Sequence, residues 1–266
     1  MKVIRRSAWM AITLSVILLA GCASSGQRSA SNDELPTSSD RTEIQRRASI
    51  RLQLAVGYYQ QGQWQTALDE AKQAIQIDPN LTDAYTMAAL TYMELGQTRL
   101  AEDHFQRAMK LAPNDPDLNN NFGWFLCQNG RPEQSIVYFD TAAANKSYQS
   151  PAKALANAGT CSLMMKNSLA AERYFNEAFR LDPTNTATNI GLARINYDRG
   201  EFQNARFYIT RLVNANVLTA EVLWLGVKTE RKLGNRSAEN SLATQLRRRY
   251  PNSSEFASYQ RGVFNE

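Results

Sequence analysis

A period of 34 residues runs through most of this chain and constrains its fold more than any other feature. One series of markers is Gly62, Gly96, Gly130, Gly200 and Gly234. A second series in the same frame is Pro79, Pro113, Pro183 and Pro251. The step from the third to the fourth glycine equals two periods plus two residues. Because glycine adopts the left-handed turn conformation and proline ends a helix, each period predicts two helices joined by a tight turn.

Small and large apolar side chains fill fixed places between these markers. The small positions include Ala55, Ala89, Gly123, Gly159 and Ala193, and the large ones Phe105, Phe139 and Phe175. Small residues let helices approach, and aromatic rings close the remaining gaps. The pattern resembles the tetratricopeptide repeat. It predicts an all-α fold, a tetratricopeptide-repeat superhelix of six helix-turn-helix repeats plus a short C-terminal capping helix.

The repeats are expected within a domain that covers residues 41–266. Their predicted bounds are 48–81, 82–115, 116–151, 152–185, 186–219 and 220–253. Asp40 and Glu43 have the spacing of a capping box, so the first helix is expected to begin near Arg41.

The later repeats depart from the pattern. In the fourth, Lys166 and Asn167 replace the turn glycine, and the turn is expected to survive because Asn tolerates the left-handed region. After the sixth, Ser253 has the position of a cap for a last helix, whose Phe256 and Tyr259 would cover the open end of the stack.

The N-terminus has the pattern of an export signal. Three basic residues precede an apolar run that ends in Leu19-Ala20-Gly21-Cys22. The run is too short to span a bilayer, which favours a signal peptide over 1–21. The last four residues resemble the lipobox of bacterial lipoproteins, which implies a lipid on Cys22 and, since Ala23 is not Asp, the periplasmic face of the outer membrane. The alternative is a plain secreted protein in which Cys22 is incidental.

Composition and net charge limit the classes of partner that the chain can bind. The Ser-rich segment 22–40 has too few apolar residues to fold, so we expect a flexible tether. Removing 1–21 takes away three of the 30 basic residues and none of the 25 acidic ones, which leaves 27 against 25 and a net charge of +2. This near balance argues against nucleic-acid binding.

Catalytic and ligand-binding motifs are missing from the sequence. The one histidine, His104, is expected at a surface or boundary, and no motif for phosphate, metal or nucleophilic chemistry occurs. We therefore expect no enzyme activity, no cofactor, no metal and no small-molecule substrate.

Two cysteines remain in the mature chain besides Cys22. Cys127 and Cys161 fall in the first helices of repeats three and four, which should lie side by side. In the oxidising periplasm we expect a disulfide between them. Because disulfide geometry is demanding, two buried free thiols remain the alternative.

Residues 119–127 read Asn-Asn-Asn-Phe-Gly-Trp-Phe-Leu-Cys, which is unusual for a generic repeat helix. This block, the lipobox and the six repeats together resemble the type IV pilus pilotin family (PilF/PilW). The resemblance covers the whole chain. It implies a non-enzymatic outer-membrane lipoprotein that helps the secretin subunit (PilQ) reach the outer membrane and form its multimeric ring.

A repeat stack offers a groove lined by the first helix of each repeat. The early repeats are the more apolar, so the secretin is expected to bind there. The predicted groove residues are Leu52, Val56, Tyr59, Thr86, Leu90, Met93, Asn120, Trp124 and Gln128. Two other functions stay open: a scaffold lipoprotein for outer-membrane protein assembly, and a regulator of peptidoglycan synthesis.

Overall fold

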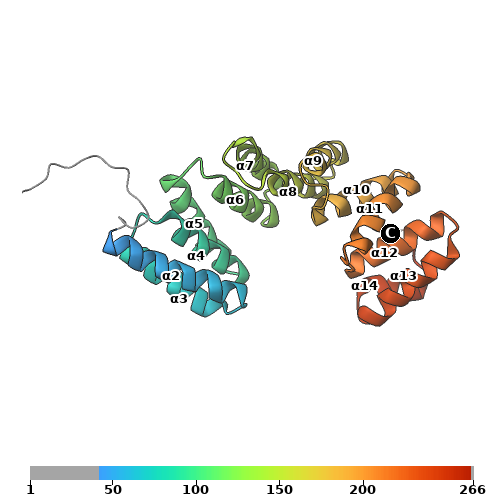
Figure 1. Cartoon of the computed structure of the whole chain (residues 1–266), viewed down its shortest axis with the longest axis horizontal. Helices are drawn as coiled ribbons and strands as arrows, with labels where there is room; N and C mark the ends of the chain where they lie inside the picture. The colour runs from blue at the N-terminus through green and yellow to red at the C-terminus, as the bar shows by residue number, and fades with distance from the viewer. Residues whose placement is uncertain (1–41, 265–266) are drawn as a thin grey trace, which may run out of the picture. The chain divides into compact units, whose positions relative to one another are not determined.

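The computed structural model describes residues 42–264, and these residues form thirteen α-helices and no strand. The helices follow one another in sequence order along the stack (Figure 1). Their bounds are α2 Glu43–Gln60, α3 Trp64–Ile77, α4 Thr82–Glu94, α5 Thr98–Leu111, α6 Pro116–Gln128, α7 Pro132–Ala144, α8 Pro151–Met164, α9 Ser168–Leu181, α10 Thr186–Asp198, α11 Phe202–Asn214, α12 Ala220–Lys232, α13 Arg236–Arg249 and α14 Ser254–Arg261.

These helices pair as the 34-residue period predicts, from α2 with α3 to α12 with α13. The all-α repeat fold is therefore confirmed. The prediction for the first helix is wrong in detail, because α2 begins at Glu43 and its capping box joins Thr42 to Gln45. Asp40, the expected cap, lies outside the described residues. The predicted signal peptide, Cys22 and the tether lie outside them as well.

Five turns between the paired helices use the predicted glycine. Gly62, Gly96, Gly130, Gly200 and Gly234 all have positive φ, between 69° and 83°. At Gly96 the amide donates to the Met93 carbonyl at 3.0 Å, and the next amide donates to Tyr92 at 2.8 Å. These bonds satisfy carbonyls at the end of α4 that have no partner inside the helix.

In repeat four, the residue with the left-handed turn conformation is not the predicted one. Lys166, not Asn167, takes the left-handed conformation, with φ 58°. The side chain of Asn167 instead accepts a hydrogen bond from the Ala170 amide and caps α9. Asn is therefore used for its capping oxygen here, and the backbone strain falls on the preceding lysine.

Aromatic side chains fill the space between neighbouring helices, as the sequence predicts. Phe105, Phe139 and Phe175 are almost fully buried. A Cβ on Gly123 would lie 2.9 Å from the Phe139 ring, and one on Gly159 would lie 2.7 Å from Phe175. Both glycines are therefore required by close packing rather than by backbone conformation.

Ion pairs join neighbouring repeats next to the turn glycine, from the residue after Gly130 in one case and from the residue before Gly200 in the other. Arg131 Nη1 lies 2.8 Å from Glu102 Oε1, and this hydrogen bond lowers the pKa of the Glu102 carboxyl. Arg199 Nη1 donates to Glu172 at 3.0 Å, and this hydrogen bond lowers the pKa of Glu172. Each pair links the second helix of one repeat to the turn of the next, which helps to hold the stacking register.

The C-terminal end of the stack is closed as predicted. Ser253 caps α14 by accepting a hydrogen bond from the Phe256 amide at 3.1 Å. Phe256 is buried, and Tyr259 and Phe264 pack with it against a cluster that contains Trp224 and Leu223. Within the described part of the chain, no helix has both the length and the apolar character needed to cross a membrane.

Candidate functional site

The first helices of the repeats form one continuous wall. Each of α2, α4, α6, α8, α10 and α12 contacts the next first helix in the series. Within residues 42–264, the second helices make no such contact with one another. The first helices are therefore closer together than the second helices, and they line the inner side of the stack, where a partner would bind.

Repeats one and two present the predicted wall residues in half-buried positions. Leu90 and Met93 pack on the apolar core of the first repeats while keeping part of their surface open. Tyr59 donates a hydrogen bond to Glu94 at 3.1 Å, which ties α2 to α4. Burial, and secondly the charge of Glu94, raise the pKa of Tyr59 to about 12. The phenol is therefore a neutral donor at physiological pH. Leu52, Val56 and Thr86 are likewise half-buried.

In repeat three the prediction for Asn120 is wrong. Its side chain is only 1% exposed, and its Oδ1 accepts a hydrogen bond from Asn157 Nδ2 at 2.9 Å. This bond joins α6 to α8, so Asn120 holds two wall helices together rather than facing a partner. Trp124 is half-buried against the next cluster, and Gln128 is exposed at the end of α6.

The two cysteines that the sequence predicts to be bonded, Cys127 and Cys161, form a disulfide in the same two helices, α6 and α8. The Sγ atoms of Cys127 and Cys161 are bonded, with their Cα atoms 6.0 Å apart. Met164 Sδ lies 3.6 Å from Cys127 Sγ. The bond crosses from α6 to α8 and makes repeats three and four a covalent unit of the wall.

Sequence reasoning missed a large hollow of the wall, which is lined by residues of α8, α10 and α12. Its volume is about 620 Å³, and Leu163, Phe175 and Ile190 contribute apolar surface. Gly191 opens its floor, because a Cβ there would lie 2.3 Å from the Phe175 ring. The signal in the sequence was this glycine, which falls inside a helix and outside the turn series.

Charged residues border that hollow. Arg194 and Glu221 approach each other to 3.8 Å, and Asp198 lies beside them. The same three residues border a second hollow of about 380 Å³, which reaches Trp224 and Lys228. The wall is therefore mainly apolar in repeats one to three and mixed in charge in repeats four to six.

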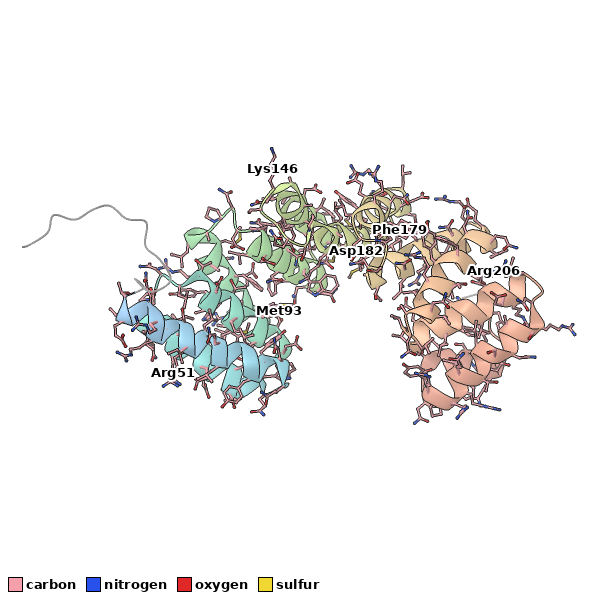
Figure 2. The ribbon with its side chains drawn as sticks, viewed as in Figure 1. Arg51, Met93, Lys146, Phe179, Asp182 and Arg206 are labelled. Carbon is pink, nitrogen blue, oxygen red and sulfur yellow. A yellow bond between two sulfur atoms is a disulfide. The ribbon has the colours of Figure 1, made fainter. Side chains whose placement is uncertain are left out.

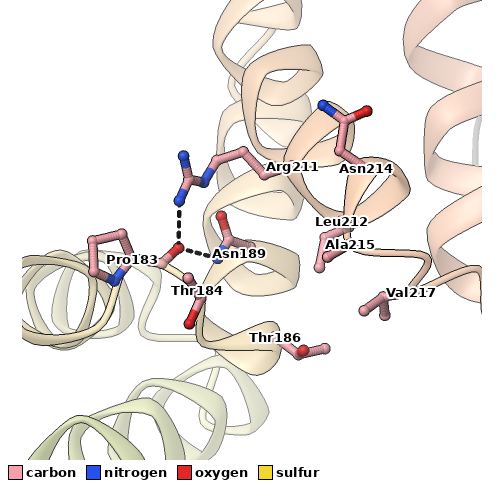
Figure 3. A pocket seen from close by; sticks show the side chains of 9 residues that line it. All are labelled: Pro183, Thr184, Thr186, Asn189, Arg211, Leu212, Asn214, Ala215 and Val217. Carbon is pink, nitrogen blue, oxygen red and sulfur yellow. Dashed lines mark hydrogen bonds between the residues drawn. The ribbon is translucent and has the colours of Figure 1, made fainter.

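A smaller pocket of about 240 Å³ lies where the turn after α9 meets the end of α11 (Figure 3). Asn189 Nδ2 and Arg211 Nη2 both donate to the Pro183 carbonyl at 2.9 Å. Asn119 makes the same bond to Pro113 at 2.8 Å. We interpret the pocket as a by-product of this repeated clamp on the inter-repeat turn.

Among the described residues, no group of three or more His, Cys, Asp and Glu side chains is placed to hold a metal ion. His104 is half-buried, with its Nδ1 2.9 Å from the Leu100 carbonyl and its ring against Tyr92. It occupies the boundary position that the sequence predicts.

Comparison with known proteins agrees with this architecture. Tetratricopeptide-repeat family models match residues 57–96, 82–115 and 104–137. The chain is 27% identical over 249 residues to the type IV pilus assembly protein PilF of Pseudomonas aeruginosa, which covers 94% of this chain and 96% of PilF.

Two solved structures are similar over most of the chain. The crystal structure of PilW, a widely conserved type IV pilus biogenesis factor, has 31% identity and a TM-score of 0.72, with coverage of 80% of this chain and 98% of PilW. The structure of Pseudomonas aeruginosa PilF has 26% identity and a TM-score of 0.76, with coverage of 82% and 99%. The similarity therefore extends through all the repeats, and the chain belongs to the PilF/PilW family of tetratricopeptide-repeat proteins of type IV pilus biogenesis.

Proposed function

We propose that this protein is the pilotin of a type IV pilus system: a lipoprotein that binds secretin subunits and promotes their delivery to the outer membrane and their assembly into a ring. Family membership is the observation that carries the proposal. It also disfavours the two alternative functions, in outer-membrane protein assembly and in peptidoglycan synthesis, since neither concerns the pilus. The protein would act by binding and not as an enzyme.

The proposed binding site is the wall of repeats one to three. Leu90, Met93 and Trp124 each keep part of a large apolar surface open while the rest packs into the stack. Such anchored side chains lose little conformational freedom on binding and commonly dominate interfaces. Asn120 is left out of the proposed site because it is buried.

The lipid anchor and the wall would have separate roles. An acylated Cys22 would keep the protein on the periplasmic face of the outer membrane, because two or more acyl chains make anchoring stable. The wall would recognise the secretin subunit. A subunit bound to many anchored copies is concentrated at the membrane, which favours ring assembly by mass action.

The binding site is tested by three substitutions on the wall. We expect Trp124→Ala to weaken capture of the secretin about 30-fold, since loss of a Trp anchor costs about 2 kcal/mol or more. Leu90→Arg and Gln128→Arg should weaken it as well. The second of these is exposed at a helix end, so it leaves the core intact. Capture is measured by pull-down, and secretin multimers are scored in the outer membrane.

The matched control is Leu169→Arg, because Leu169 is 80% exposed at the start of α9 in repeat four, outside the proposed site in repeats one to three. It adds the same charge and should leave secretin capture unchanged. Circular dichroism reports whether each variant is folded. Full secretin multimers in folded, membrane-bound Gln128→Arg and Trp124→Ala variants would exclude this wall as the site.

The anchor is tested separately. Cys22→Ala should leave the protein soluble or uncleaved and should reduce the outer-membrane secretin ring. Mass spectrometry of the mature native protein should find acyl chains on Cys22. An unmodified Cys22 there would exclude the lipoprotein part of the proposal while leaving secretin binding open.

A further inference from the structure

The two ends of the repeat stack are finished in opposite ways. The C-terminal end is covered by α14, as terminal repeats require for solubility. At the N-terminal end, no described helix covers the outer side of α2, and three aliphatic side chains are open to solvent: Ile44 is 56% exposed, Ile50 52% and Leu54 41%. An uncovered apolar row at the end of a stack indicates that something else covers it.

A depression in this end joins the apolar side chains to basic ones. We call it the N-terminal patch, and its volume is about 570 Å³. It is lined by Arg47, Ile50, Arg51, Leu54, Gln73, Gln76 and Ile77. Two guanidinium groups, three aliphatic side chains and two amides contribute to it, and its lining has no carboxylate. Figure 2 shows Arg51 on the side of the first helix pair that faces away from Met93 of the wall.

Of the two arginines that line the patch, only Arg51 forms an ion pair with a described residue. Arg47 is exposed and makes no ion pair with any described residue. Arg51 Nη1 lies 3.0 Å from Glu70 Oε2, yet its side chain remains 41% exposed. Arg46 pairs with Glu43 at 2.9 Å on the adjacent surface. The patch therefore presents one free guanidinium and one that can be shared with a further anion.

We propose that the N-terminal patch lies on the anionic phospholipid surface of the membrane to which the chain is anchored, an inference that rests on the proposed acylation of Cys22. Guanidinium groups bind phosphate oxygens with charge-assisted hydrogen bonds. Aliphatic side chains on the same helix face enter the boundary between headgroups and acyl chains. The combination of basic and aliphatic residues fits this surface, because the Glu70 carboxylate that pairs with Arg51 is itself only 15% exposed.

The length of the preceding segment supports the same occupant. Nineteen residues lie between Cys22 and Thr42. Fully extended, they reach at most about 65 Å, so an acylated Cys22 would keep Thr42 within that distance of the bilayer. A contact too weak to hold a free protein is then populated, because the anchor supplies a high effective concentration. Each basic residue near an anionic surface strengthens such a contact about fivefold.

Docking would orient the wall relative to the membrane. The patch and the proposed secretin site lie on different faces of the same repeat, since Leu52 and Val56 belong to the wall and Ile50 and Leu54 to the patch. Contact with lipid through one face leaves the other free for the partner. The protein would thus present its groove at a set height and angle above the bilayer.

The experiment uses the mature chain 22–266 with its Cys22 thiol coupled to a maleimide lipid in vesicles. Cys127 and Cys161 are bonded to each other, so Cys22 is the one reactive thiol of this chain. Gln73→Trp places a fluorophore in the patch. Gln134→Trp, at an exposed position on α7, is the matched control. The probe is phosphatidylglycerol with brominated acyl chains, which quenches indole fluorescence at short range.

We expect the added fluorescence of Gln73→Trp to be quenched at least threefold more than that of Gln134→Trp. Arg47→Glu, or the pair Ile50→Ser with Leu54→Ser, should abolish the difference, whereas Val137→Ser on α7 should not. Equal quenching of the two tryptophans would overturn the proposal. So would equal quenching of Gln73→Trp in brominated phosphatidylcholine, because the arginines then contribute nothing.

Two further outcomes identify other occupants. Dimerisation of the uncoupled chain in sedimentation, abolished by Leu54→Ser, would show that a second copy covers the patch and would overturn the proposal. Loss of secretin capture by Arg47→Glu in detergent, where no bilayer is present, would assign the patch to the secretin and would overturn it too. Because the anchor here is chemical, failure of vesicle docking is distinguishable from failure of natural acylation or of secretin binding.

Discussion

Single residues decide how closely the repeats follow their common pattern. Where the turn residue is glycine, the left-handed conformation is reached without a Cβ penalty. Lys166 and Asn216 hold it without being glycine, with φ 58° and 57°. The cost is smaller for Asn, whose short polar side chain tolerates this region better than lysine does. Lys166 is therefore the most strained turn position of the described stack.

This strain predicts that Lys166→Gly stabilises the protein. Relief of the left-handed conformation outweighs the extra entropy that glycine gives the unfolded chain, so the free energy of unfolding should rise by about 0.5–1 kcal/mol. Urea denaturation followed by circular dichroism measures it. Gly96→Val is the reverse experiment and should cost one to a few kcal/mol, roughly, by strain alone, since nothing lies within 4 Å of an added Cβ. A neutral result for both variants would contradict the assignment of strain to these turns.

A hydrogen bond and a disulfide join helices of different repeats. The amide pair of Asn120 and Asn157 joins α6 to α8, and the disulfide of Cys127 and Cys161 joins the same two helices. Asn120 and both cysteines are buried, and for the Asn120 amide an unpaired polar group there would be costly. Repeats three and four are thus held by specific bonds where a generic repeat relies on apolar packing. This provides a structural reason for the unusual block at 119–127.

The disulfide makes a testable contribution at this level. Reduction, or replacement by Cys127→Ser with Cys161→Ser, should lower the free energy of unfolding by up to about 3–4 kcal/mol, because the closed loop restricts the unfolded chain. Urea denaturation with and without reductant measures the loss. In the double-serine variant the effect of reductant should vanish. Thiol titration of the denatured, unreduced protein that finds Cys127 and Cys161 free would contradict the bond.

Among the described helices α2 to α14, the stack has one covered end and one uncovered end. At the closed end, α14 places Phe256 and Tyr259 on the last pair, where Trp224 is 9% exposed. Repeat stacks unfold from their ends, since a terminal repeat has one neighbour only. The closure of one end and the exposure of the other suit a protein that meets another surface at its N-terminal side.

Truncation before Ser253 should therefore destabilise repeat six. Removal of α14 strips a buried Phe and its neighbours from the last pair, which corresponds to roughly 3–5 kcal/mol. We expect early protease cleavage within α12 and α13 and a lower melting temperature. Truncation after Gly262 removes residues 263–266, of which Phe264 packs on the last pair, and should have a smaller effect. Equal stability of the longer truncation and the intact chain would show that α14 is dispensable.

Much of the fold follows from the sequence because it depends on local rules. A glycine that must turn, a proline that must end a helix and small residues at fixed spacing place α3 to α14 within the predicted frame. Residues that depart from the repeat pattern were harder to predict. The strain at Lys166 could not be told from sequence, because Lys166 and Asn167 are adjacent and only the backbone geometry shows which one turns.

The candidate site likewise has features that the sequence predicts and features that only the tertiary structure shows. The sequence by itself determined that the first helices form the wall and that large apolar residues such as Leu90 and Met93 lie on it, because helical periodicity assigns faces. Only the tertiary structure decided that Asn120 is buried, since this depends on Asn157 of another repeat lying opposite. The hollow above Phe175 and the N-terminal patch are likewise tertiary. Each is formed by residues from two or more helices, whose separation is set by packing and not by local sequence.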